Sequence, residues 1–256
     1  MNILNGMGGL HTLDDFSHAA GEYVDPISTK FRDYRVWECP PNGQGIIALL
    51  MLNIIGKAEI ADEPLSPERI HLEIEAMRLA YAQRDAFVAD PKHGHVPVDE
   101  ILSDAHADQL RDQIDPDRAG KPGATALPRA HEDTVYVSVV DGDGNSASFI
   151  NSLFMPYGTG LLAPKSGVLL HCRGISFNLE EGHPNTIAPL KRPMHTIIPG
   201  MLSDSGRIRM PFGVMGGHYQ ALGHAQLLTR LIDYGCDLQK AVDLPQILPP
   251  DGRSEC

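Results

Sequence analysis

The chain has 256 residues, a formal net charge of −12 at pH 7 and 42% hydrophobic residues. Such a composition supplies a substantial core and excludes wholesale disorder, a collagen-like repeat and a disulfide-dense miniprotein. The acidic excess repels phosphate backbones, so we expect no nucleic-acid partner. No apolar run is long enough to span a bilayer, no signal peptide is visible and the four cysteines are scattered, which favours a reducing, cytoplasmic location.

The first half of the sequence predicts mainly helices. The expected elements are, in chain order, a short helix over 13–20, a strand over 34–37, a buried apolar helix over 46–55, an amphipathic helix over 99–114 and an exposed loop over 115–130. The polar, Gly-bearing turn at 42–45 has two interpretations. It is a tight strand-to-helix turn, or it is an anion site, because a helix N-terminus presents free N–H groups.

The clearest predicted helix follows Ser66 and Pro67, which suit the N-cap and the first helical position. Four residues at helical spacing predict one buried stripe: Ile70, Ile74, Met77 and Tyr81. We expect three charged residues to form the solvated face: Glu68, Glu75 and Arg78.

The second half of the sequence is richer in strands. A hairpin is predicted from alternating residues at 135–140, a turn at 141–145 and a second strand at 146–151. Further elements are expected in chain order: strands over 168–171, 196–198 and 208–210, then a helix over 218–234. Helices followed by strands and a closing helix indicate a layered α/β or α+β fold.

Thr134 stands where the exposed loop meets a strand that the pattern predicts to be buried. One interpretation is simply a β-branched residue that begins a strand. The other is an N-terminal nucleophile, exposed by cutting the Asp133–Thr134 bond. Its new α-amine, with a pKa of about 7.7–8.0, could accept the hydroxyl proton, so one residue would serve as nucleophile and base.

Two other groups are candidates for chemistry. Gly216 and Gly217 precede a helix, where their backbone N–H groups could hold an oxyanion or could only serve helix entry. Arg173, His195 and Thr196 could bind a substrate, although a lone histidine is more often structural. The dispersed histidines and cysteines show no metal-ligand spacing, so we expect no metal.

Motifs in a fixed order resemble those of the γ-glutamyltranspeptidase family of N-terminal-nucleophile (Ntn) hydrolases. They lie at residues 8–16, 40–45, 51–54, 75–82, 90–91, 133–145, 158–160, 191–193 and 216–217. The resemblance implies an αββα sandwich and self-cleavage between Asp133 and Thr134. It divides the chain into a large-subunit part, 1–133, and a small-subunit part, 134–256, which remain one structural domain. The two processed subunits would then associate.

By this resemblance Thr134 attacks an amide and forms an acyl-enzyme. Ser152 matches the hydroxyl that positions the nucleophile, and Gly216 and Gly217 match the oxyanion hole. Water or an amine acceptor then releases the acyl group from an amide or γ-glutamyl substrate, with no cofactor.

Five positions in the substrate-binding region depart from typical γ-glutamyl enzymes: Phe154, Arg173, Ser176, His195 and Thr196. Arg173 and Ser176 stand where those enzymes use a Gln and an Asp to grip an α-amino group. Arg173 would repel an ammonium, so we expect an amide that carries a carboxylate or oxo-acid group. The pattern is similar to a divergent branch of amidohydrolase-like and cephalosporin-acylase-like members.

The resemblance also places part of the family's large subunit upstream of Met1 and its closing strands after Cys256. We therefore expect an incomplete sandwich in this chain. The alternative to an active amide hydrolase or acyl transferase is an inactive, unprocessed remnant. Self-cleavage distinguishes the two.

Overall fold

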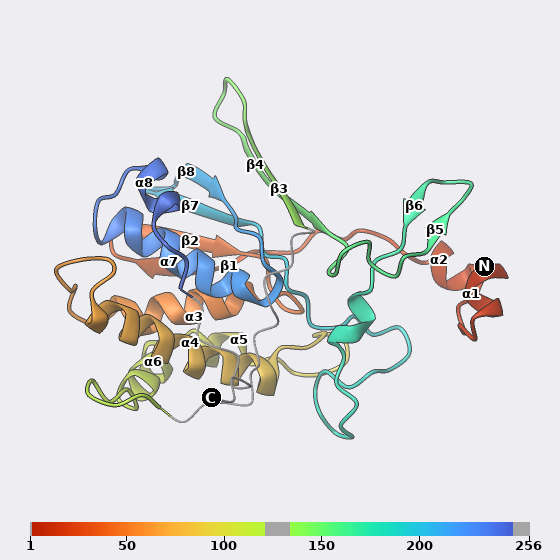
Figure 1. The fold of residues 1–256 in the computed structure, drawn as a ribbon, viewed down its shortest axis with the longest axis horizontal. Helices are drawn as coiled ribbons and strands as arrows, with labels where there is room; N and C mark the ends of the chain where they lie inside the picture. Colours follow the sequence, from red (N-terminus) through yellow and green to blue (C-terminus); the bar gives the residue numbers. More distant parts are fainter. Residues whose placement is uncertain (1, 121–133, 248–256) are drawn as a thin grey trace.

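The computed structural model describes residues 2–120 and 134–247, which form a mixed structure of helices and sheet (Figure 1). Its centre is an antiparallel four-stranded sheet in the order β1-β2-β7-β8. These strands are β1 (Ile27–Phe31), β2 (Tyr34–Glu38), β7 (Gly200–Asp204) and β8 (Arg207–Phe212). β2 pairs with β7 through the register Val36↔Leu202, so residues far apart in sequence meet in the middle of the sheet.

Two helices, α3 (Gly45–Gly56) and α7 (Gln220–Ile232), cover one face of this sheet, and α4 (Pro67–Phe87) packs against them on the side away from the sheet. α3 contacts β1, β2, α4 and α7, and almost all of its residues are buried. The core lies between the helices and the sheet, where Val36 and Leu202 point from the strands toward α3 and α7. A helix that is apolar on all sides is stable only in such a position.

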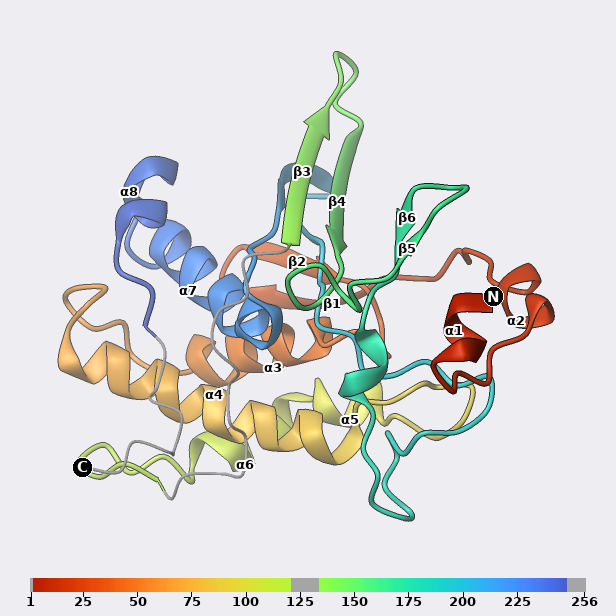
Figure 2. The ribbon, with the colours of Figure 1, turned by 45° about the vertical axis from the view of Figure 1, so that its right-hand side comes forward.

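Shorter elements connect or flank this centre. They are α1 (Asn2–Gly6), α2 (Leu13–Ser17), α5 (Val98–Ile101), α6 (Asp104–Arg111), β5 (Leu162–Ala163), β6 (Val168–Leu169), the 3₁₀ helices η1 (Arg173–Ser176) and η2 (Gly217–Tyr219), and α8 (Leu238–Asp243). Figures 1 and 2 show α1, α2 and the β5–β6 hairpin at one end of the molecule, away from α4 and α8. Within residues 2–120 and 134–247, no helix has the length and hydropathy needed to cross a membrane.

The hairpin of β3 (Thr134–Val140) and β4 (Ser146–Ser152) stands out from the sheet (Figure 2). It is anchored to β8, because Ser148 Oγ donates a hydrogen bond to the Phe212 carbonyl (3.2 Å). Along its length one face presents exposed apolar side chains, namely Val135, Val137, Val139 and Phe149, which are 44–61% exposed. The expectation of a buried strand was therefore wrong beyond Thr134, because alternation predicts an apolar face but not what covers it.

The structure confirms most of the predicted elements and corrects several details. The predicted α4 stripe is buried at Met77 and Tyr81, but Ile70 and Ile74 are only half-buried. Glu75, expected in solvent, is 5% exposed, because it accepts hydrogen bonds from Arg78 and from the Gly120 backbone.

Two predicted elements differ in kind. The helix expected over 99–114 is two short helices, α5 and α6, since Ser103 caps the second one and so interrupts the first. The segment 196–198, expected to be a strand, is irregular, and the residue before it, His195, forms a single bridge with Gly43.

Candidate active site

Thr134 lies at the start of β3, directly opposite Ser152 at the end of β4. The hairpin register places both side chains on one face, and Thr134 Oγ1 donates a hydrogen bond to Ser152 Oγ (3.1 Å). Ser152 Oγ also accepts the Phe154 N–H (3.0 Å), which fixes the hydroxyl that Thr134 meets. Thr134 is 5% exposed, whereas Ser152 is half-buried. Asp133, the other half of the predicted cleavage site, lies outside the described residues.

Phe154 connects this hydroxyl pair to Arg173. Its backbone has a φ of +81°, in the left-handed region, which is uncommon for a bulky side chain. Its ring lies 4.9 Å from the Arg173 guanidinium carbon and meets the His218 ring edge-on at 5.9 Å. The side chain that stands where the resemblance expects an asparagine is thus an aromatic platform for a cation.

Arg173 is a buried cation with few partners. Its Nη1 donates to Thr196 Oγ1 (2.6 Å), whereas its Nε and Nη2 are buried without a hydrogen-bond acceptor. Burial lowers the pKa of Arg173 to about 10, so the group stays charged at neutral pH. Ser176, in the same 3₁₀ helix, also has a buried hydroxyl oxygen without a hydrogen-bond partner. Two of the predicted substrate-binding residues, Arg173 and Thr196, are thus joined by a hydrogen bond.

His195 lies beside this pair, but its side chain is held neutral. Burial, followed by the nearby charges of Arg173 and His171, lowers the pKa of His195 to about 3. Its Nδ1 accepts the Ile197 N–H (3.3 Å). A neutral imidazole with this neighbour contributes shape and a hydrogen bond rather than charge.

Gly216 and Gly217 form the entry to η2 and α7. Their φ angles are +120° and +57°, and a Cβ on Gly216 would lie 3.1 Å from the Tyr219 ring. These conformations favour glycine at both positions. The predicted glycine pair is thus set by backbone geometry and lies where α7 begins.

Gln44 connects the two halves of the site and was not predicted as a functional residue. It is fully buried, and its Nε2 donates to the Thr196 carbonyl (2.8 Å) and the Gly217 carbonyl (3.0 Å). Its backbone N–H donates to the His195 carbonyl (2.9 Å), so the turn at 42–45 is a strand-to-helix connection that binds protein oxygen. The motif at 40–45 was the one sequence signal that included Gln44, and it gave no indication of these distant hydrogen-bond partners.

Two further side chains near Gly217 were not predicted. Arg84 Nη1 donates to Gln44 Oε1 (3.3 Å) and lies 3.0 Å from His218 Nδ1. Arg84, His218 and Ser176 line a cavity of about 530 Å³. No amphipathic pattern indicates this role, because Arg84 reads as an ordinary charged residue of a long helix. Across residues 2–120 and 134–247, no cluster of three or more His, Cys, Asp or Glu side chains is arranged to hold a metal.

The chain is similar to known proteins over almost all of its length. The sequence model of the family described as "Gamma-glutamyltranspeptidase" matches residues 1–251. The chain is 36% identical over 248 residues to the glutathione hydrolase-like YwrD proenzyme of Bacillus subtilis (strain 168), covering 95% of this chain and 46% of that protein. It is 33% identical over 250 residues to the oxamate amidohydrolase proenzyme of Klebsiella pneumoniae, covering 96% of this chain and 46% of that protein.

A solved structure is similar as well. The crystal structure of cephalosporin acylase from Bacillus halodurans superposes with a TM-score of 0.85 at 40% identity, covering 96% of this chain and 44% of that chain. The chain therefore spans about half the length of the relatives that it matches.

Proposed function

Because this chain belongs to the gamma-glutamyltranspeptidase family and has its Ntn-hydrolase fold, we propose that it acts as an amide hydrolase or acyl transferase with Thr134 as nucleophile. The observation that carries the proposal is the hydrogen bond of 3.1 Å between the buried Thr134, the first residue of a strand, and the half-buried Ser152. The matched relatives named above are called proenzymes, which supports activation by cleavage.

The first step is hydrolysis of the Asp133–Thr134 bond, in which one water gives Asp133 a free carboxylate and Thr134 a free α-amine. The amine accepts the hydroxyl proton near neutral pH, because its ordinary pKa is about 7.7–8.0. The freed oxygen attacks the substrate carbonyl and forms a tetrahedral intermediate. Once Thr134 has given up its proton, the Ser152 hydroxyl, which already lies 3.1 Å away, donates to the Thr134 oxygen and orients it.

The backbone N–H groups of Gly216 and Gly217 would stabilise the oxyanion of that intermediate. Gln44 supports this role, because its amide joins the Gly217 and Thr196 carbonyls and so fixes the glycine turn. The proton held by the α-amine passes to the departing amine and leaves an acyl ester on Thr134. Water or an amine acceptor then attacks the ester, which gives hydrolysis or transfer.

Cleavage need not separate the two pieces. β1 and β2 come from one piece and β7 and β8 from the other, and β2 pairs with β7. α3 of the first piece also packs on α7 of the second. We therefore expect the two subunits to remain one folded unit after processing.

Denaturing mass spectrometry tests the proposal. The chain should separate into residues 1–133 and 134–256 on incubation, whereas Thr134→Ala should remain whole and Thr134→Ser should still be cut. Native gel filtration of the cut protein should show both pieces in one peak. An unmodified chain that stays uncut contradicts the proposal and supports an inactive, unprocessed protein.

A further inference from the structure

Arg173 borders a cavity whose other walls are mainly apolar. The cavity measures about 640 Å³, and its apolar walls include Leu4, Phe16, Leu170, Ile175 and Phe177. This volume lies within the range of about 300–1,000 Å³ that is typical of small-molecule sites. Ile175 and Phe177 also line the more polar cavity at Arg84, so the segment that carries Arg173 lies between the two cavities.

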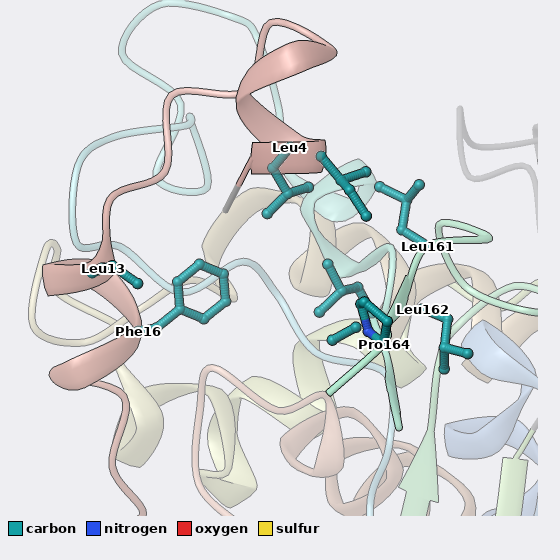
Figure 3. A pocket seen from close by; sticks show the side chains of 9 residues that line it. Leu4, Leu13, Phe16, Leu161, Leu162 and Pro164 are labelled. Atoms are coloured by element: carbon teal, nitrogen blue, oxygen red, sulfur yellow. The ribbon is translucent and has the colours of Figure 1, made fainter. Parts of the chain in front are cut away.

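The apolar cavity continues toward the end of the molecule. Leu4, Phe16 and Leu170 also line a second cavity of about 270 Å³, between α1, α2 and the β5–β6 hairpin. Figure 3 shows Phe16 and Leu13 on α2 facing Leu162 and Pro164 on the hairpin. The two cavities therefore adjoin at their three shared residues and make up a largely apolar space, with Arg173 on the border of the larger cavity.

Arg173 is the charged group of this space. Among the residues that the structure describes, it makes no ion pair with a carboxylate, and its Nε and Nη2 lack acceptors. An unpaired buried cation is costly, and a bound carboxylate would supply two acceptors in the fork geometry of a guanidinium. The neighbouring His171 and His195 add no charge at neutral pH, since their pKa values are lowered by burial and by Arg173.

The position of Arg173 relates this space to the nucleophile. Its guanidinium lies under the Phe154 ring, and the Phe154 N–H donates to Ser152 Oγ, the partner of Thr134. Phe154 is therefore the single residue that links a ligand bound to Arg173 with the Thr134–Ser152 pair.

We propose that Arg173 and the apolar cavity form one substrate subsite for an amide that carries both a carboxylate and an apolar group. The carboxylate binds Nε and Nη2 of Arg173, and the apolar group lies against Leu170, Phe177 and Phe16. This inference rests on the proposed amide chemistry, which it deepens by naming both parts of the substrate. A small carboxylate alone would leave the apolar walls unused.

Binding to Thr134→Ala tests the subsite without turnover. The probes are oxanilate (a carboxylate, an amide and a phenyl ring), ethyl oxanilate (the same amide with the charge removed) and oxamate (the same carboxylate without the ring). Calorimetry should show that oxanilate binds about 30-fold or more tightly than its ester, because a desolvated charge pair is lost. It should also bind about tenfold or more tightly than oxamate, because the ring buries apolar area.

Variants made in the Thr134→Ala chain test separately which residues bind the carboxylate and which bind the apolar group. Arg173→Met should weaken oxanilate about 30-fold or more, whereas Arg173→Lys should weaken it less. The matched control Arg209→Met, an exposed arginine on β8, should leave the affinity unchanged. Leu170→Ala should weaken oxanilate severalfold and leave oxamate unchanged.

The ligand comparison decides the question even if Arg173→Met fails to fold. Equal affinity for oxanilate and its ester, or no binding of either, overturns the proposal, and equal affinity for oxanilate and oxamate overturns its apolar half. Self-cleavage is measured separately. An uncut Thr134 chain whose Thr134→Ala form binds oxanilate through Arg173 would refute the proposed function and keep the subsite.

Discussion

Two buried arginines in this molecule have opposite surroundings. Arg69 on α4 is 1% exposed, and its Nε contacts Glu73 Oε1 at 2.7 Å while its Nη1 lies 3.4 Å from Asp233 Oδ2. Arg173 is 3% exposed, and among the described residues its side chain bonds the Thr196 hydroxyl and lies against the Phe154 ring, with no carboxylate partner. Both keep N–H groups without an acceptor, but only the charge of Arg69 is balanced by carboxylates.

The difference separates a structural charge from one that awaits a ligand. The charged cluster at Arg69 joins α4 to the end of α7. Removing the arginine or its carboxylates would leave the opposite charge buried without its partner. At Arg173 no carboxylate among the described residues would be left behind. The uncompensated charge is therefore a property of the site rather than of the core, and the predictions below test this distinction.

The largest effect is expected at the balanced charge. Arg69→Met should lower the free energy of unfolding by about 3–5 kcal/mol, because Glu73 would be left buried without its cation and Asp233 would keep only Arg32. Urea denaturation measures this loss, and the exposed control Arg209→Met should change it by less than about 0.5 kcal/mol. A loss below about 1 kcal/mol would show that the cluster at Arg69 is no more structural than Arg173.

A smaller loss is expected where neutral groups hold the site together. Gln44→Met should lower the free energy of unfolding by about 2 kcal/mol, because the Thr196 and Gly217 carbonyls lose their buried donor. The same variant should slow cleavage at Thr134, since the glycine turn loses its fixed position. The control is Gln113→Met, an exposed amide that bonds only within its own turn. Equal stability of both variants would show that Gln44 does not hold the site together.

The local parts of the site could be predicted from the sequence. The turn at 141–145 fixes the hairpin register, and that register alone places Thr134 opposite Ser152. The apolar run of α3 and the Ser66–Pro67 start of α4 likewise depend only on neighbouring residues. These features were predictable because their physical causes lie within a few residues.

The long-range parts could not be predicted in this way. Gln44 meets Thr196 and Gly217 across more than 150 residues of sequence, and no periodicity encodes such a contact. β1 and β7 were missed because their short polar and Gly-bearing sequences form strands only by pairing with β2. Glu75 was predicted in solvent because a carboxylate on a helix normally is, until a partner such as the Gly120 N–H buries it.

The pH dependence of stability tests whether Arg173 is the lone charge of its surroundings. His195 is neutral in the folded state with a pKa of about 3, against about 6.5 when unfolded. Below pH 6.5 the unfolded chain binds the extra proton, so this histidine lowers the free energy of unfolding as pH falls. Between pH 7 and 5 the loss should be about 1–2 kcal/mol greater in the unmodified chain than in His195→Asn. Parallel curves would mean that His195 can be protonated beside Arg173.

The smallest effect, and the sharpest contrast with Arg69, is expected at Arg173. Arg173→Met removes a cation that burial penalises and that no described carboxylate neutralises, while it sacrifices one hydrogen bond to Thr196 and the contact with Phe154. These terms nearly offset, so the free energy of unfolding should be unchanged or rise by up to about 1 kcal/mol. Urea denaturation without ligand measures it beside Arg69→Met. A loss of 2 kcal/mol or more would place Arg173 with Arg69 among the structural charges, because a side chain kept for a ligand should cost little when it is replaced in the ligand's absence.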